Sequence, residues 1–177
     1  MTSIRNLVVA ATCLASVTGA AAETPLTDFN GVWRGTGQGR GGPLQSMQET
    51  VCQNAVRATL RRMNSEMTCD WKSGVRKQVR LTVELAGDQF TGRVTQRTIR
   101  ADREDAVISG TIAGKKTDSS ASLTVTWKGA TPNATVNLKL NSPASYAMNV
   151  TALGLTMMDV TFTRTAERAP RRQRPNN

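Results

Sequence analysis

The stretch VRKQVRLTVELAGDQFTGRV, residues 75–94, decides the fold because it predicts two antiparallel strands and the turn between them. Along residues 75–86 apolar side chains alternate with polar ones, which is the period of a half-buried strand. Gly87-Asp88 has the glycine-first chemistry of a two-residue type II′ turn. That turn sets three cross-strand pairs: Leu85 with Phe90, Val83 with Gly92, and Leu81 with Val94. A slip of one residue would break the shared apolar face, so the pattern predicts a β-hairpin.

Basic side chains gather on the opposite face of this hairpin. The four of matching parity, called here the basic face, are Arg76, Arg80, Arg93 and Arg97. Further cations that could extend it into a basic wall are Arg57, Arg61, Arg62, Lys77, Arg100 and Arg103. The chain carries a net charge of +10, so an anionic partner such as envelope lipid or polysaccharide is one expectation. A specific nucleic-acid partner is not expected, because three tryptophans, three phenylalanines and one tyrosine are too few for a stacking platform.

The same kind of strand recurs along the chain. Threonine, valine and isoleucine make up nearly a quarter of the residues after position 22, and these β-branched residues favour strands. Further strands are predicted at residues 32–36, 46–53, 66–72, 107–112, 123–127 and 136–140. The predicted fold class is all-β: one antiparallel up-and-down β-barrel of about eight strands, with up to about ten countable. A β-sandwich is the alternative. Barrel closure is favoured because it removes the exposed edges of a meander.

Residues 54–64 leave helix and strand open. Val56, Leu60 and Met63 have helical spacing behind Asn54, which could cap a helix, yet a simple hairpin also fits this segment.

The last hairpin allows two connections. A two-residue turn at Leu153-Gly154 would put the apolar residues of its two strands on opposite faces. A three-residue loop that starts at Ala152, with Gly154 in the left-handed conformation, keeps them on one face. The register predicted by this loop pairs Met148 with Met158 and Tyr146 with Val160.

The first 22 residues have the pattern of a cleaved export signal. Arg5 precedes an apolar run, and Ala20-Ala21-Ala22 precedes Glu23 as a small-residue cleavage site. The apolar run is too short for a transmembrane span, so a periplasmic or secreted protein is expected. Cys13 leaves with the signal, and the remaining pair, Cys52 and Cys69, is predicted to form a disulfide. The expected organisation is a β-barrel domain at 23–165 followed by a disordered basic tail at 166–177.

The chain offers little for catalysis. It has no histidine, which excludes histidine relays and histidine-ligated metals, and no cofactor or metal is expected. Gly37-x-Gly39-x-x-Gly42 matches a dinucleotide-binding pattern, but Pro43 and a polar stretch follow, so a hairpin loop is predicted instead. Glu49 and Asp70 could face each other as a carboxylate pair, although nothing else indicates a sugar site. We therefore expect a protein that is not an enzyme.

Gly31-x-Trp33 at the start of the first strand resembles the signature of calycin barrels, the lipocalin and avidin group. In those families the tryptophan closes one end of the barrel, and a basic residue of the last strand packs across it. By this resemblance Gly31, Trp33 and Arg164 form a barrel-closure signature, with Arg164 pointing inward onto Trp33. The order of Gly-x-Trp, glycine-rich loop, paired cysteines and strand meander also resembles a group of small exported bacterial proteins.

This fold predicts a binding protein whose lumen is either filled or lined for a small apolar ligand. The predicted inward residues are Trp71, Phe90, Trp127, Tyr146, Met148 and Met158 (or Met157). An interaction protein that docks an anionic partner through its basic face is the alternative.

Overall fold

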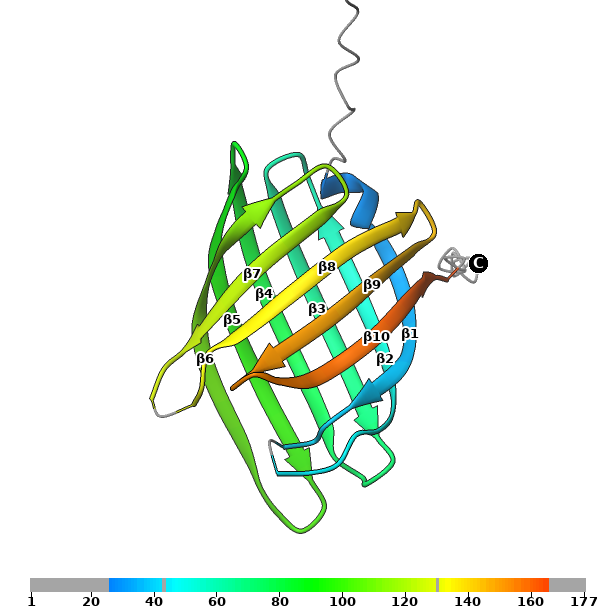
Figure 1. The fold of residues 1–177 in the computed structure, drawn as a ribbon, viewed down its shortest axis with the longest axis vertical. Coiled ribbons are helices and arrows are strands. Elements are labelled where there is room, and N and C mark those ends of the chain that lie inside the picture. The colour runs from blue at the N-terminus through cyan, green and yellow to red at the C-terminus, as the bar shows by residue number, and fades with distance from the viewer. Residues whose placement is uncertain (1–25, 43, 130, 166–177) are drawn as a thin grey trace, which may run out of the picture.

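A computed structural model describes residues 26–42, 44–129 and 131–165; the expected export segment 1–22 and the basic tail 166–177 lie outside these ranges. The described residues form one short 3-10 helix and ten antiparallel strands that close into a barrel (Figure 1). Each strand pairs with its neighbours in sequence, and β1 closes the barrel by pairing with β10. The all-β up-and-down barrel is confirmed, with ten strands. The elements are η1 Leu26–Phe29, β1 Gly31–Gly39, β2 Gln48–Ala58, β3 Arg62–Trp71, β4 Arg76–Ala86, β5 Gln89–Arg100, β6 Arg103–Lys116, β7 Ser120–Trp127, β8 Ala134–Ser142, β9 Ser145–Ala152 and β10 Leu155–Arg164.

The hairpin of β4 and β5 has the predicted register. Leu85 is opposite Phe90, Val83 opposite Gly92 and Leu81 opposite Val94. Gly87 has a φ of +61°, the left-handed conformation that the turn requires and that glycine adopts without a steric penalty. The period-two pattern was therefore sufficient to place these two strands.

The ambiguous segment 54–64 is a hairpin rather than a helix. It contains the end of β2 and the start of β3, and the two strands pair from Gln48–Ala58 to Arg62–Trp71. Cys52 lies directly opposite Cys69 in this pairing, and the predicted disulfide joins them. Both cysteines face the interior and are almost fully buried.

The predicted register of the last hairpin is wrong. Met148 is opposite Val160, and Tyr146 is opposite Phe162. The chain turns in two residues, Leu153-Gly154, both with positive φ (53° and 72°). The register then shifts between Thr156 and Met158, so Met157 is the extra residue of a β-bulge. The bulge restores the apolar parity that a two-residue turn alone would have broken.

The first strand is longer than predicted. Gly37 and Gly39, expected in a loop, belong to β1, which is shown in blue in Figure 1. Every position of its inner face except Trp33 is glycine, which leaves room for bulky residues of the neighbouring strands. A Cβ on Gly35 would lie 2.6 Å from Cγ1 of Val160 and 2.7 Å from Cε1 of Phe162. Glycine is required there by close packing, not by a turn.

The helix η1 covers the end of the barrel that is uppermost in Figure 1. Leu26 is buried there with 2% of its surface exposed. The Nε1 of Trp33 donates a hydrogen bond of 2.8 Å to the carbonyl oxygen of Phe29, and Asn30 exchanges hydrogen bonds with the backbone of Ala58. These bonds hold η1 across the barrel. No helix among residues 26–42, 44–129 and 131–165 is long and apolar enough to cross a membrane.

Candidate functional site

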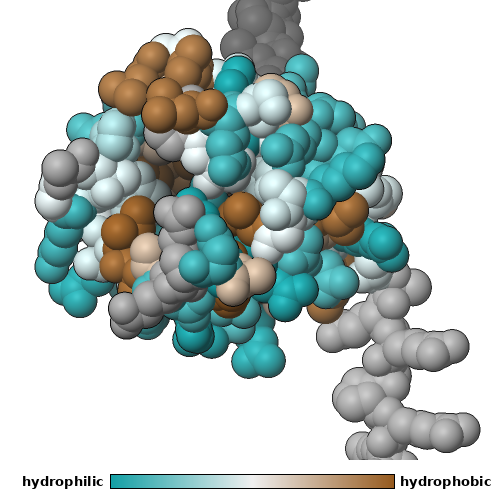
Figure 2. Space-filling model, turned by 90° about the horizontal axis from the view of Figure 1, so that it is seen from below, coloured by the Kyte–Doolittle hydropathy of each residue, from teal (hydrophilic) through white to brown (hydrophobic). Residues whose placement is uncertain are grey.

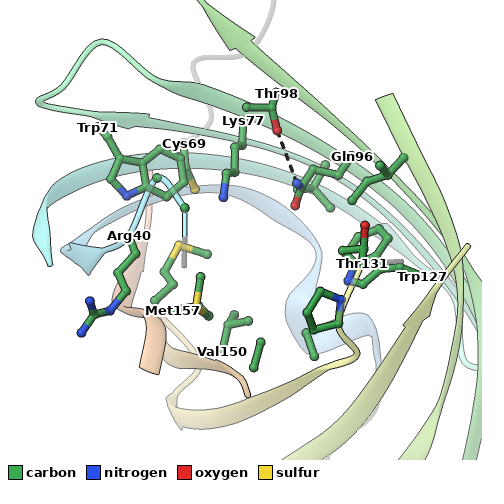
Figure 3. A pocket seen from close by; sticks show the side chains of 18 of the residues that line it. Arg40, Cys69, Trp71, Lys77, Gln96, Thr98, Trp127, Thr131, Val150 and Met157 are labelled. Atoms are coloured by element: carbon green, nitrogen blue, oxygen red, sulfur yellow. Dashed lines mark hydrogen bonds between the residues drawn. The ribbon is translucent and has the colours of Figure 1, made fainter. Parts of the chain in front are cut away.

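A cavity of about 280 Å³ lies at the barrel end opposite η1; we call it the mouth cavity. It is bounded by the ends of strands and by three connections, those between β1 and β2, β7 and β8, and β9 and β10. Figure 2 views this end of the molecule and shows apolar patches beside a hollow. The labelled side chains of Figure 3 surround an open space from several strands. The mouth cavity is therefore a product of the closed barrel, not of a single loop.

A second space of about 140 Å³, the deep chamber, extends the mouth cavity toward η1. Its lining is predominantly apolar and includes Phe29 of η1 itself. The two spaces share a ring of lining residues at mid-height: Met67, Val79, Gln96, Trp127, Ala134, Val150 and Met158. A ten-stranded barrel is wider than an eight-stranded one, in which side chains are enough to fill the interior. The lumen is thus continuous, apolar at depth and closed at one end.

Two cations face the mouth cavity from neighbouring strands. Lys77 of β4 pairs across the strands with Thr98, so Arg100 of β5 is its diagonal neighbour on the inner face. Burial lowers the pKa of the Lys77 ammonium below its ordinary value, and the charge of Arg100 lowers it further. No aspartate or glutamate is among the described residues that line this cavity. Its electrostatic character is therefore positive.

Trp71 forms the wall beside Lys77 (Figure 3). The Nζ of Lys77 lies 5.2 Å from the centroid of the indole ring, within the range of a cation–π contact. Trp71 is only 5% exposed, yet its Nε1 has no hydrogen-bond partner among the described residues. A Cβ on Gly39 would come within 2.9 Å of that nitrogen, so the glycine makes room for the indole.

A third cation, Arg40, lies at the rim of the barrel, where its guanidinium forms hydrogen bonds with the backbone. Its Nε donates to the carbonyl oxygen of Thr156 at 3.1 Å, and its Nη1 donates to that of Gln45 at 2.6 Å. Its backbone N–H donates to the carbonyl oxygen of Met157, the bulge residue, at 2.8 Å. Arg40 thus ties the β1–β2 connection to β10 and shapes the mouth.

A small polar network lies in the wall of the deep chamber. The hydroxyl of Ser65 donates to Oδ1 of Asn54 at 2.6 Å, and Nδ2 of Asn54 donates to the hydroxyl oxygen of Tyr146 at 2.9 Å. Burial raises the pKa of Tyr146 far above its ordinary value, although the Asn54 bond opposes the shift. The Tyr146 ring stacks on Phe162 with centroids 4.6 Å apart. The phenol is therefore neutral and held by packing.

The six residues predicted to face inward lie on the inner face. Five line the lumen: Trp71 the mouth cavity, Tyr146 and Met148 the deep chamber, and Trp127 and Met158 both. The sixth, Phe90, lies instead at the closed end, where it borders a small void together with Leu26 and Phe29. Met157, considered as an alternative to Met158, also lines the mouth cavity.

The barrel-closure residues meet at the closed end. Trp33 is completely buried, and Arg164 is its cross-strand partner on β10. The guanidinium carbon of Arg164 lies 4.6 Å from the Trp33 ring centroid, while the side chain itself stays exposed. Its Nη2 donates to the carbonyl oxygen of Asp28, and an ideal Cβ on Gly31 would lie 3.8 Å from the arginine stem.

The basic face lies on the outside of the barrel, where carboxylates accompany three of its four arginines. The ion pairs are Arg76 with Asp70, Arg80 with Glu66, and Arg97 with Asp105. Glu49 and Asp70 both point outward, and Asp70 is 2.6 Å from the Nε of Arg76. They are not gathered in the lumen as a carboxylate pair. Among the described residues, no three cysteine, aspartate or glutamate side chains gather closely enough to hold a metal.

Assigning Lys77 and Arg100 to the outer basic wall was wrong. Both line the lumen, because Lys77 shares the parity of Val79 and Arg100 shares that of Val94. Strict counting by two along each strand was the signal that could have found them. The chain matches no protein-family model and no curated protein. Fold and site together define it as a closed antiparallel β-barrel with an internal cavity.

Proposed function

We propose that the protein is an exported calycin-type barrel that binds a small apolar molecule in its lumen and catalyses no reaction. The observation that carries the proposal is the continuity of the mouth cavity with the deep chamber through their shared lining. Ligand sites are typically apolar cavities of about 300–1,000 Å³ with a few polar groups, and this lumen lies at the lower end of that range. The buried disulfide and the closure of one end by η1 suit a rigid container.

A lumen-filling variant tests this proposal. The full chain would be titrated with an apolar fluorescent dye, and native mass spectrometry would show any molecule that co-purifies. We expect Ala134→Phe to abolish dye binding, because Ala134 lines both spaces. Thr124→Phe adds the same ring to the exposed outer face of β7 and is expected to leave binding intact. Equal dye binding by the two variants would place the dye outside the lumen and refute the proposal.

Docking of an anionic partner through the basic face is the weaker alternative. Ion pairs neutralise much of the charge of Arg76, Arg80 and Arg97. Salt-sensitive binding to anionic vesicles that Arg93→Gln abolishes, with no binding of apolar molecules, would favour it.

A further inference from the structure

The lumen holds a cation without a counter-ion. Lys77 points into the mouth cavity (Figure 3), and no described acidic side chain shares that cavity. The ion pairs Arg76–Asp70, Arg80–Glu66 and Arg97–Asp105 lie on the outer surface, and none of them includes Lys77. Its contact in the protein is the face of Trp71, and its neighbour Arg100 repels it. Placing an unpaired ammonium in an apolar surrounding is unfavourable, so the apo protein carries an electrostatic defect that an anion would relieve.

Arg100 adds a second cation to the same cavity. It is the diagonal neighbour of Lys77 on the inner face, and none of the ion pairs Arg76–Asp70, Arg80–Glu66 and Arg97–Asp105 includes it. Lys77 and Arg100 therefore supply cationic donors at one end of the lumen, where the described lining offers no carboxylate to accept from them. The indole nitrogen of Trp71 does not belong to this group, because it is enclosed in the wall against Gly39. An oxyanion would supply the missing acceptor.

The deep chamber offers an apolar space next to the cationic mouth cavity. It is mainly apolar and closed by η1, and its wall contains the hydrogen-bonded network of Asn54, Ser65 and Tyr146. Its volume of about 140 Å³ fits one slender chain rather than two. The lumen is thus apolar at depth and cationic at the mouth.

We infer that the ligand is a single-tailed amphiphile with an anionic headgroup, such as a long-chain carboxylate. The tail enters the deep chamber, and the head stays in the mouth cavity against Lys77 and Arg100. This inference rests on the proposed lumen binding and specifies its ligand. Lys77 is the residue that selects the charge, because its ammonium packs on the Trp71 ring in the cavity wall and no described carboxylate there pairs with it.

Three amphiphiles with the same tail separate the headgroup from the tail. Dodecanoate, dodecanol and dodecyltrimethylammonium would be titrated into the full chain by calorimetry, below their micellar concentrations. We expect dodecanoate to bind at least about tenfold more tightly than dodecanol, as charge-assisted hydrogen bonds predict. The cationic amphiphile is expected to bind weakest of the three. Equal affinities for dodecanoate and dodecanol would overturn the inference while leaving lumen binding intact, whereas no binding of any of them would refute both.

Matched variants assign the preference to Lys77. Lys77→Gln is expected to reduce the affinity for dodecanoate about tenfold, to the level of dodecanol, without changing the affinity for dodecanol. Arg93→Gln removes one positive charge from the outer face and is expected to leave all three affinities unchanged. An unchanged dodecanoate affinity in Lys77→Gln, or an equal loss in Arg93→Gln, would show that the preference comes from overall charge or from elsewhere. Lys77→Met repeats the test with a side chain that an apolar lumen accepts, which guards against misfolding.

Discussion

Arg164, at the end of the last strand, lies over the indole of Trp33 near the start of the first, with 4.6 Å between its guanidinium carbon and the ring centroid. The two residues are also direct cross-strand partners where β10 closes on β1. The indole in turn donates to Phe29 and the guanidinium to Asp28, both in η1. This pair therefore joins the two ends of the barrel sheet and fixes the helix that closes the lumen.

Arg164→Ala is expected to lower the free energy of unfolding by about 2 kcal/mol, from the lost cation–π contact and the lost charged hydrogen bond. Arg164→Lys keeps the charge but not the planar group, so an intermediate loss is expected. Urea denaturation measures both. Arg34→Ala, on the exposed outer face of β1, is the control and is expected to stay within about 0.5 kcal/mol of wild type. If Arg164→Ala matched this control, the pair would have no role in stability.

Gly35→Ala is expected to destabilise the barrel by about 1–3 kcal/mol, because the added methyl would overlap the side chains of Val160 and Phe162. Gly42→Ala is the matched control, since a Cβ there meets nothing within 4 Å. Thermal unfolding followed by circular dichroism compares the two. Equal melting temperatures would mean that β1 and β10 can separate at no cost.

Replacing both Cys52 and Cys69 by alanine is expected to cost about 3 kcal/mol, the entropy of closing a loop of this size. The same loss is expected when the wild-type protein is unfolded under reducing conditions. The double variant should not respond to reductant, which provides the control. A double variant as stable as the oxidised wild type would show that strand pairing alone orders β2 and β3 in the unfolded chain.

Tyr146 is the sole tyrosine of the chain, so phenolate absorbance reports on it alone. Because burial raises its pKa in the folded state, the folded protein holds this proton at a pH where the unfolded chain releases it. The resulting stability is complete below the ordinary pKa of about 10 and is lost as pH rises above it. We expect phenolate to appear together with unfolding. Tyr146→Phe should lack this alkaline loss, and a phenol that titrates near pH 10 in the folded protein would contradict its burial.

Lys77→Met is expected to raise the free energy of unfolding of the apo protein by about 1 kcal/mol, as is common when a residue kept for function is replaced. Because the pKa of Lys77 is lowered in the folded protein, the unfolded chain binds more protons. The destabilisation that Lys77 causes is therefore larger at neutral pH than at alkaline pH, and it disappears as the pH rises to the ordinary pKa of lysine. Denaturation at neutral and alkaline pH measures this convergence. Arg93→Met, on the outer face, should show no such pH-dependent gain. Destabilisation by Lys77→Met at neutral pH would contradict the electrostatic account.

The class of fold could be predicted from local features. Alternation with a period of two, together with the Gly87-Asp88 turn, was enough for the register of β4 and β5, because each depends only on residues close in sequence. The pairing of Cys52 with Cys69 followed from counting the cysteines that remain after residue 22. The same parity, counted strictly, also puts Lys77 on the inner face, although this side chain was assigned to the outer basic wall.

Other features depend on contacts between distant segments, and only the closed barrel decides them. The bulge at Met157 was not predictable from the hairpin alone. The carbonyl oxygen of Met157 accepts a hydrogen bond from the backbone N–H of Arg40, which is distant in sequence. The open lumen depends on the number of strands that close and on the glycines of β1, which no single strand specifies. The sequence by itself therefore determined a disulfide-linked antiparallel β-protein, because alternation and turn chemistry are local. Tertiary structure decided that Lys77 faces an apolar cavity without a counter-ion, because a charge acquires its environment only when all ten strands surround it.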